Sequence, residues 1–334
     1  MDFSEFLVWS QRSRLVTPRA YRLCETRIAQ AYCAIRPVPE LSANPPEIHR
    51  CDLALLWCAT RGIEATLSPT ALACEGVRHA LQIIFQSLAR RRMTIALPAD
   101  VYPVYWQLAA QARLPSIGFE TFPSFQLSAI LRLAAMSGAS VALLPQPLKL
   151  HGRIWTEEEV DSACDWLHGA PDRRIILDGV YGFGSPLDSR TRRLIATDQV
   201  LFLDSLSKGW LHQRVFGIAM VPQSDLPIYS ATFRSLIPDQ PKLLLAHALL
   251  TKYRDFPNRI LEDMATRRAE FLARAQQARI PTLPVAGGYL VAIQGSAPTL
   301  LAQHSLLAIP ATAFGSRLRD WSIASVLPTP DTAS

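Results

Sequence analysis

Apolar residues along this chain follow two different spacings. Longer stretches repeat them every three or four positions, as amphipathic helices do, and short continuous apolar runs lie between these stretches. The helices predicted from the first pattern are 51–62, Val77–Arg90, Val101–Ala112, Phe125–Met136 and Thr156–Leu167. The strands predicted from the second are Met93–Leu97, Ser116–Phe119, Ser140–Leu144, Arg174–Asp178, Val200–Asp204 and Gly217–Val221. This alternation predicts an α/β domain with three layers, in which helices cover both faces of a mainly parallel sheet.

The two ends of the chain have other patterns. We expect the first 40 residues to form helices with basic faces. From Gln240 to Ile280 the pattern is again helical, with an interruption near Pro257. Short strands with Pro and Gly residues then follow at Leu283–Ile293, Leu306–Phe314 and Asp320–Leu327. These segments predict a second, smaller α+β domain.

The composition of the 334 residues narrows the class of protein. Hydrophobic residues make up 49% and charged residues 19%, which excludes a solvated, disordered chain. The formal net charge of +6 comes from scattered residues, so we expect no nucleic-acid partner. No apolar stretch approaches the roughly 18 residues of a membrane span, and the first residues lack the order of a signal peptide. The six cysteines form no C-x-x-C pair, which favours reduced thiols in a cytoplasmic protein.

Polar and aromatic residues come directly after four of the predicted strands. Ligands of an open parallel sheet bind beyond the carboxyl ends of its strands, so residues at these positions are candidates for a site. The set consists of Tyr102, Gln146, Asp178, Tyr181, Ser205, Ser207 and Lys208. Their convergence from four strands predicts a binding site at one edge of the sheet.

Lys208 and Asp178 are the two residues of this set that most directly suggest chemistry. Lys208 is the one lysine that we expect at a strand end with such neighbours. A partly desolvated lysine is a nucleophile toward aldehydes, whereas a solvated lysine in a surface loop would have no such role. Asp178 ends a buried strand and needs a cationic partner, which a protonated pyridine nitrogen or a structural arginine would supply.

In order and spacing, these residues resemble the fold-type I pyridoxal-phosphate enzymes, and most closely the class I/II aminotransferases, including histidinol-phosphate aminotransferase-like proteins. The resemblance runs from about Thr70 to Val221 and continues more weakly through Gly287-Gly288-Tyr289. It implies that Lys208 binds pyridoxal 5′-phosphate as a Schiff base and carries the substrate proton. It also implies that Asp178 faces the pyridine nitrogen and that Tyr181 faces the phenolic oxygen.

The resemblance implies further contacts to the cofactor. Tyr102 would stack on its ring. The phosphate would bind to the start of a helix and to side chains after the next strands, which are Gly76, Val77, Arg78, Ser205, Ser207 and Arg214.

Three positions depart from the family pattern. Gln146 precedes Pro147 where Asn is usual, and we expect its longer amide to contact the phenolic oxygen. Arg214 is expected to bind the phosphate in place of an arginine whose usual position holds Phe216. Asp320 stands where an arginine usually binds the substrate carboxylate, so we expect the neighbouring Arg319 to take that role.

The leading hypothesis is therefore a pyridoxal-phosphate-dependent aminotransferase that acts on an amino acid or a related amine in biosynthesis. The departures favour an alternative, in which the same fold serves a decarboxylase, lyase, cyclase or oxidase of specialised metabolism. A third hypothesis is a non-catalytic protein that binds an effector. The resemblance also implies a cytoplasmic homodimer, with a large cofactor-binding domain over 48–235 and a small domain built from 1–47 plus 236–334.

Overall fold

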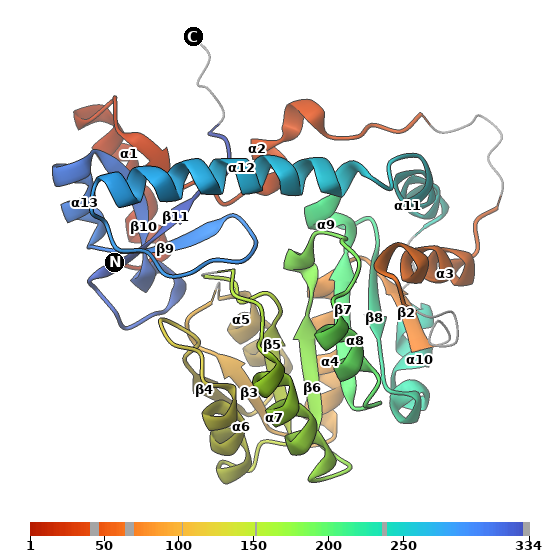
Figure 1. Ribbon diagram of the computed structural model, residues 1–334. Coiled ribbons are helices and arrows are strands. Elements are labelled where there is room, and N and C mark those ends of the chain that lie inside the picture. The colour runs from red at the N-terminus through yellow and green to blue at the C-terminus, as the bar shows by residue number, and fades with distance from the viewer. Residues whose placement is uncertain (41–46, 64–69, 102, 151, 236–238, 330–334) are drawn as a thin grey trace.

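The largest element of the protein is a twisted sheet that forms the lower part of the molecule in Figure 1. The structure is a computed structural model that describes residues 1–40, 47–63, 70–101, 103–150, 152–235 and 239–329. Within these residues the sheet has seven strands in the order β2-β8-β7-β6-β5-β3-β4. In that order they are Ala71–Cys74, Gly217–Met220, Val200–Ser205, Arg174–Asp178, Val141–Pro145, Ile95–Pro98 and Ser116–Phe119.

The pairing in this sheet is mainly parallel, as predicted. Every neighbouring pair from β7 through β6, β5 and β3 to β4 runs parallel. Only β8 departs from this direction among the described strands, because it pairs antiparallel with both β7 and β2. The carboxyl ends of β5, β6 and β7 therefore meet at one edge of the sheet.

Helices pack on both faces of the sheet and give it three layers. Side chains of β5 alternate between two cores: Val141 and Leu143 belong to one, whereas Ala142 and Leu144 belong to the other. The first core also contains α4 (Val77–Arg90), α5 (Val104–Ala112) and α10 (Leu226–Ser235). The second contains α3 (Arg50–Arg61), α6 (Leu127–Met136), α7 (Glu157–His168) and α8 (Ser189–Ile195). Because a strand buried on both faces needs apolar side chains at every position, its sequence reads as a continuous apolar run.

A second sheet joins the two ends of the chain. Its order is β1-β10-β11-β9, and the strands are Tyr21–Leu23, Leu306–Pro310, Trp321–Ser325 and Leu290–Gln294. β1 runs parallel to β10, and the other two pairs are antiparallel. Figure 1 shows α1 (Phe3–Val16) and α13 (Ala297–His304) beside this sheet. Residues separated by almost the whole chain therefore form one structural unit.

A long helix connects the regions of the two sheets. α12 (Phe256–Gln277) runs from beside α11 (Gln240–Lys252) to the second sheet, as Figure 1 shows. The remaining short elements are α2 (Ile28–Ala31), α9 (Leu206–Gly209), η1 (Cys33–Ile35), η3 (Val180–Gly182), η4 (Gln223–Asp225) and η5 (Ala311–Phe314). None of the described helices combines the length and apolar character needed to cross a bilayer.

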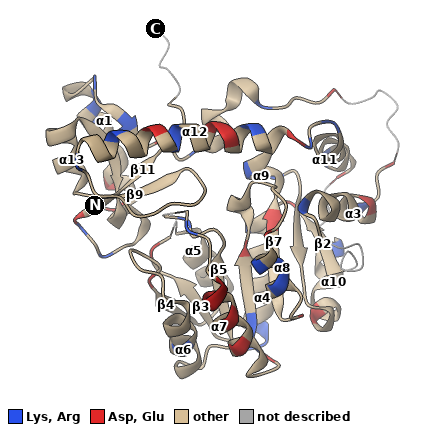
Figure 2. Cartoon of the chain, in the orientation of Figure 1, with Lys and Arg blue, Asp and Glu red and all other residues tan. Residues whose placement is uncertain are grey.

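Charged residues pair between neighbouring helices on the surface. Figure 2 shows the acidic residues of α7 beside basic residues of α8. Arg190 Nε lies 2.7 Å from Glu157 Oε1, and Arg193 pairs with Asp161. These exposed pairs contribute little free energy, so the packing of the apolar core is what holds the layers together.

The structure corrects several predictions of local structure. The first 40 residues are not all helical, because Tyr21–Leu23 is a strand. Three residues are too few to show a periodicity, and β10 supplies the hydrogen-bonding partner that makes this segment a strand. Residues 283–289 precede β9 instead of belonging to it. The strand β2 and the helices α8 and α10 were not predicted.

Candidate active site

A cavity of about 750 Å³ opens at the carboxyl edge of the large sheet. The ends of β6 and β7 and the start of α4 line one side. The helix α1, residues 24–28 and the segment at Tyr289 and Leu290 line the other side. The cavity therefore lies between the two sheets and is built from segments that are far apart in the sequence.

Asp178 is the buried anion of this cavity. It is the last residue of β6, and only 1% of it is exposed. Its Oδ1 accepts a hydrogen bond of 3.2 Å from the backbone N–H of Val180, and its Oδ2 accepts one from the Tyr105 hydroxyl. The ammonium of Lys149 lies 3.1 Å from Oδ2. Two donors and one cation therefore compensate the carboxylate for its loss of water.

Tyr105 acts as a donor to Asp178. It belongs to α5, and burial together with the negative charge of Asp178 raises the pKa of its phenol well above the ordinary value. The hydroxyl of Tyr105 therefore keeps its proton and donates a hydrogen bond to the carboxylate.

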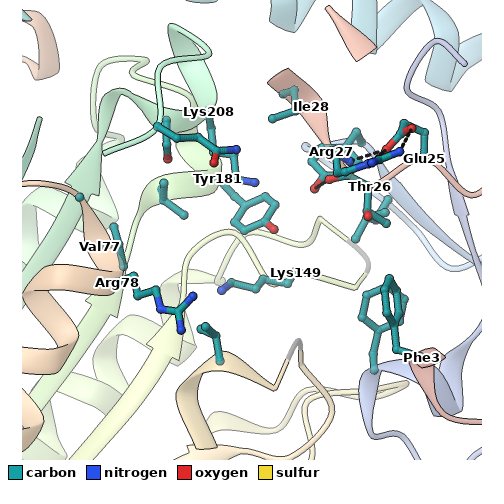
Figure 3. Close-up of a pocket in the computed structure, with 18 of the residues that line it drawn as sticks. Phe3, Glu25, Thr26, Arg27, Ile28, Val77, Arg78, Lys149, Tyr181 and Lys208 are labelled. Atoms are coloured by element: carbon teal, nitrogen blue, oxygen red, sulfur yellow. Dashed lines mark hydrogen bonds and ion pairs between the residues drawn. The ribbon is translucent and has the colours of Figure 1, made fainter. Parts of the chain in front are cut away.

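Tyr181 lies between two lysine side chains, as Figure 3 shows. Its ring centroid is 5.2 Å from Lys208 Nζ and also 5.2 Å from Lys149 Nζ. Burial alone would raise the pKa of Tyr181, but the positive charges of Lys208 and Lys149, together with a hydrogen bond with Tyr289, outweigh that effect and lower it. Its neighbour Tyr289, with ring centroids 5.9 Å apart, has a pKa raised well above the ordinary value by burial and by Tyr181. The phenol of Tyr181 is thus the acidic one of this pair.

One end of the cavity has the features of an anion-binding site. The helix α4 begins at Val77 after Gly76, whose φ of +119° favours glycine. The hydroxyls of Ser205 and Ser207 lie 2.6 Å apart at the end of β7. Arg78 and Arg214 also line this cavity. Backbone amides at a helix start, hydroxyls and guanidinium groups are the donors that bind phosphate in proteins.

The opposite wall carries both apolar and charged side chains. Its apolar residues include Phe3, Phe6, Leu290 and Phe314. Arg14 and Arg27 are the arginines on this side, and Arg27 Nε lies 3.2 Å from Glu25 Oε1. This wall therefore suits a ligand with an apolar part.

The structure brings most of the predicted site residues to this one cavity. Those that line it are Gly76, Val77, Arg78, Asp178, Tyr181, Ser205, Ser207, Lys208 and Arg214. Tyr102 lies outside the described residues. Gln146 and Arg319 are not among the described residues that line the cavity.

The side chains of Gln146 and Arg319 lie elsewhere. The Oε1 atom of Gln146 accepts a hydrogen bond of 3.3 Å from the backbone N–H of Trp155. Arg319 is exposed and lines a separate surface pocket with Met1 and Asp2. The prediction that Arg319 binds a substrate carboxylate has no support from this position.

Sequence reasoning missed two side chains of this site, Lys149 and Tyr105. The expectation that Lys208 is the one lysine at a strand end is wrong, because Lys149 comes four residues after β5 and lines the same cavity. The chain has only four lysines, namely Lys149, Lys208, Lys242 and Lys252. A search for lysines in the segments that follow strands would have found both.

Several aminotransferases of known structure have the same architecture as this chain. No family model and no curated protein matches the chain. A Thermus thermophilus aspartate aminotransferase double mutant superimposes with a TM-score of 0.74 at 16% identity, over 99% of this chain and 93% of its own. An aminotransferase from Mycobacterium tuberculosis gives a TM-score of 0.75 at 15% identity, over 98% and 92%. The chain has the fold of the pyridoxal-phosphate-dependent aminotransferases.

One of the similar structures has a different activity in its name. A putative PLP-dependent β-cystathionase from Corynebacterium diphtheriae gives a TM-score of 0.66 at 15% identity, over 97% of this chain and 85% of its own. The aminotransferase fold therefore agrees with the predicted fold class, and it leaves the reaction to be argued from the site residues.

Proposed function

We propose that the protein is a pyridoxal-phosphate-dependent aminotransferase that acts on an amino acid or a related amine. The observation that carries this proposal is that Asp178, Tyr181 and Lys208 line one cavity of an aminotransferase fold. They stand at the carboxyl edge of the sheet, where this kind of fold binds its ligands.

The residues of the cavity fit the cofactor. Pyridoxal phosphate has an anionic phosphate at one end and a basic ring nitrogen at another position. The start of α4, Ser205, Ser207 and Arg214 offer donors to the phosphate, and the Asp178 carboxylate offers an acceptor to the protonated nitrogen. The Tyr181 phenol is available to the phenolic oxygen. We keep the stacking of Tyr102 on the ring as a prediction.

Lys208 is proposed as the catalytic residue. Its amine, 5.2 Å from the Tyr181 ring centroid, would hold the cofactor through its aldehyde, and it would take a proton from the substrate Cα and return it. The bound cofactor supplies an electron sink for the bond that is broken. Asp178 would keep the ring nitrogen of a bound cofactor protonated, and the hydrogen bond that Tyr105 donates orients Asp178.

The substrate is proposed to enter from the side of α1. Phe3, which packs near the buried Phe6 and Phe314, favours an apolar substrate side chain, since it presents aromatic surface to the cavity. Arg14 and Arg27 line this side, so both are better candidates than Arg319 for a substrate carboxylate.

A second candidate function is a lyase of the same fold. The putative β-cystathionase among the similar structures favours it, and so does Asp320 in place of the usual carboxylate-binding arginine. In that case the same Lys208 would remove a proton from the Cα, and a leaving group on the substrate would depart.

We further propose a cytoplasmic homodimer that works in biosynthesis, and a chain divided into 48–235 and 1–47 plus 236–334. The strands of the large sheet all come from the first part and those of the second sheet from the other, which supports the division. Light scattering of the purified protein tests the dimer.

Absorption spectroscopy tests the proposed function directly. Wild-type protein mixed with pyridoxal phosphate should acquire the visible absorption of a Schiff base, and Lys208→Ala should abolish it. Lys252→Ala, at the exposed end of α11, is the matched control and should leave the spectrum unchanged. A colourless wild-type protein would overturn the proposal. Incubation with single amino acids then separates the two functions, because transamination accumulates pyridoxamine phosphate and a keto acid, whereas a lyase releases ammonia.

A further inference from the structure

The positive charge nearest to Asp178 comes from the chain itself. Lys149 Nζ lies 3.1 Å from Asp178 Oδ2, and the exposed fractions of the two side chains are 11% and 1%. The same ammonium lies 4.2 Å from the ring centroid of Tyr105. Lys149 is thus enclosed by a carboxylate and two aromatic rings, with little contact to water.

The backbone around Lys149 is held in place. The N–H of Leu148 donates to the carbonyl of Arg153 at 2.8 Å, and the N–H of Gly152 donates to the carbonyl of Leu148 at 2.8 Å. Gly152 in turn accepts a hydrogen bond of 2.9 Å from the N–H of Gly287. Because this turn is tied at both ends, the flexible four-carbon stem of Lys149 is the part that can move.

Asp178 is already paired with one cation. Its Oδ1 is occupied by the N–H of Val180, and its Oδ2 receives Tyr105 and Lys149. The proposed function requires the same carboxylate to face the protonated ring nitrogen of the cofactor. Two cations at one buried carboxylate would repel each other at short range.

We propose that Lys149 is the resident counterion of Asp178 and that pyridoxal phosphate displaces it on binding. This inference rests on the proposed function. In the cofactor-free protein, Lys149 prevents Asp178 from being a buried unpaired charge, which would be destabilising. In the loaded protein the ring nitrogen takes over this role, and Lys149 turns into the cavity that it already lines beside Arg78 (Figure 3).

The exchange has a measurable consequence for affinity. The proposal means that pyridoxal phosphate binds only molecules in which Lys149 has left Asp178. Its apparent Kd is then the intrinsic Kd divided by the fraction of such molecules. If the Lys149–Asp178 pair is closed in about nine of ten cofactor-free molecules, removing the lysine tightens binding about tenfold. If Lys149 only attracted the anionic cofactor, removing this lysine would weaken the binding of pyridoxal phosphate.

The first experiment is a titration of cofactor-free protein with pyridoxal phosphate. For Lys149→Met we expect a Kd about tenfold lower than for wild type, a lower unfolding temperature without cofactor, and an unchanged one with cofactor. Lys252→Met should match wild type in all three quantities. In the Asp178→Asn background, Lys149→Met should no longer tighten binding, since the competition is lost.

A second measurement uses only the wild-type protein and covers the case in which Lys149→Met does not fold. Pulse labelling of amines, read by mass spectrometry with Lys252 as internal reference, should modify Lys149 faster once pyridoxal phosphate is bound. Lys208 should become protected in the same sample.

The outcomes separate the two proposals. If wild type does not bind pyridoxal phosphate, the proposed function fails. If wild type binds it, but Lys149→Met binds no more tightly or the labelling of Lys149 does not rise, the displacement of Lys149 is refuted and the proposed function stands.

Discussion

Arg61 and Asp204 form an ion pair in the interior, directly behind the candidate site. Nε of Arg61 lies 2.9 Å from Oδ2 of Asp204, and their side chains are only 2% and 1% exposed. Arg61 also donates a hydrogen bond to the carbonyl of Ser185. It therefore ties α3 to the end of β7 and to the segment that follows Tyr181. Burial lowers the pKa of Arg61 and raises that of Asp204, and their mutual attraction opposes both shifts.

Replacing Arg61 should destabilise the protein strongly. Arg61→Met leaves Asp204 as a buried unpaired charge, so we expect the free energy of unfolding to fall by about 3–5 kcal/mol. Denaturant unfolding measures this. The double variant Arg61→Met/Asp204→Leu should recover most of the loss, because no charge remains unpaired. Arg254→Met, whose side chain is 69% exposed, should change little. An equally small change for Arg61→Met would contradict this account of the pair.

Gly217 should tolerate no side chain. A Cβ atom there would lie 2.6 Å from the Cα of Gly76 and 2.7 Å from the carbonyl oxygen of Asp204. Gly217→Ala must push Gly76, at the start of α4, away from Gly217, so we expect a loss of about 1–3 kcal/mol in stability and weaker binding of pyridoxal phosphate. Titration and denaturant unfolding check both. Gly287→Ala is the control, since its Cβ would meet nothing closer than 3.9 Å. Normal cofactor affinity in Gly217→Ala would show that Gly76 does not need this close contact.

Tyr181 should make stability depend on alkaline pH. Its pKa is lowered in the folded protein, so its ionised form favours folding. This contribution is complete above the ordinary tyrosine pKa of about 10 and is lost as the pH falls through the folded value. The stability difference between wild type and Tyr181→Phe should therefore grow as the pH rises from the folded pKa of Tyr181 to about 10. Spectrophotometric titration of cofactor-free protein should show the early phenolate, and Lys208→Ala should raise its pKa. A pH-independent difference would refute the assignment.

Tyr105→Phe should weaken the support of Asp178. It removes a hydrogen bond to a buried carboxylate and adds no bulk, so we expect a loss of about 1.5–3 kcal/mol in the unfolding free energy of cofactor-free protein. Tyr21→Phe, at a tyrosine that is 45% exposed, should stay within about 0.5 kcal/mol. Equal stabilities of the two variants would mean that the Tyr105 hydroxyl contributes nothing.

The amino-acid sequence by itself determined six of the seven described strands of the large sheet and most of the residues that line the cavity. Arg174–Asp178 and Ser116–Phe119 are strands with the predicted bounds, and Val77–Arg90 is the predicted helix. These elements could be predicted because their patterns are local: the helix has one apolar face, and Arg174–Asp178 is buried at every position. The edge of the sheet that carries the cavity could be predicted from these strands, because parallel strands bring their carboxyl ends together.

The tertiary structure decided which side chains complete the site. β1 is a strand because β10 lies beside it, and Arg319 lines a separate surface pocket although it is close in sequence to the expected arginine position. Lys149 reaches Asp178, and Arg61 reaches Asp204, across long stretches of chain. Such contacts depend on how loops and helices meet in space. A buried charge must have an opposite charge close to it in the folded protein, and the spacing of residues along the chain does not show which one that is.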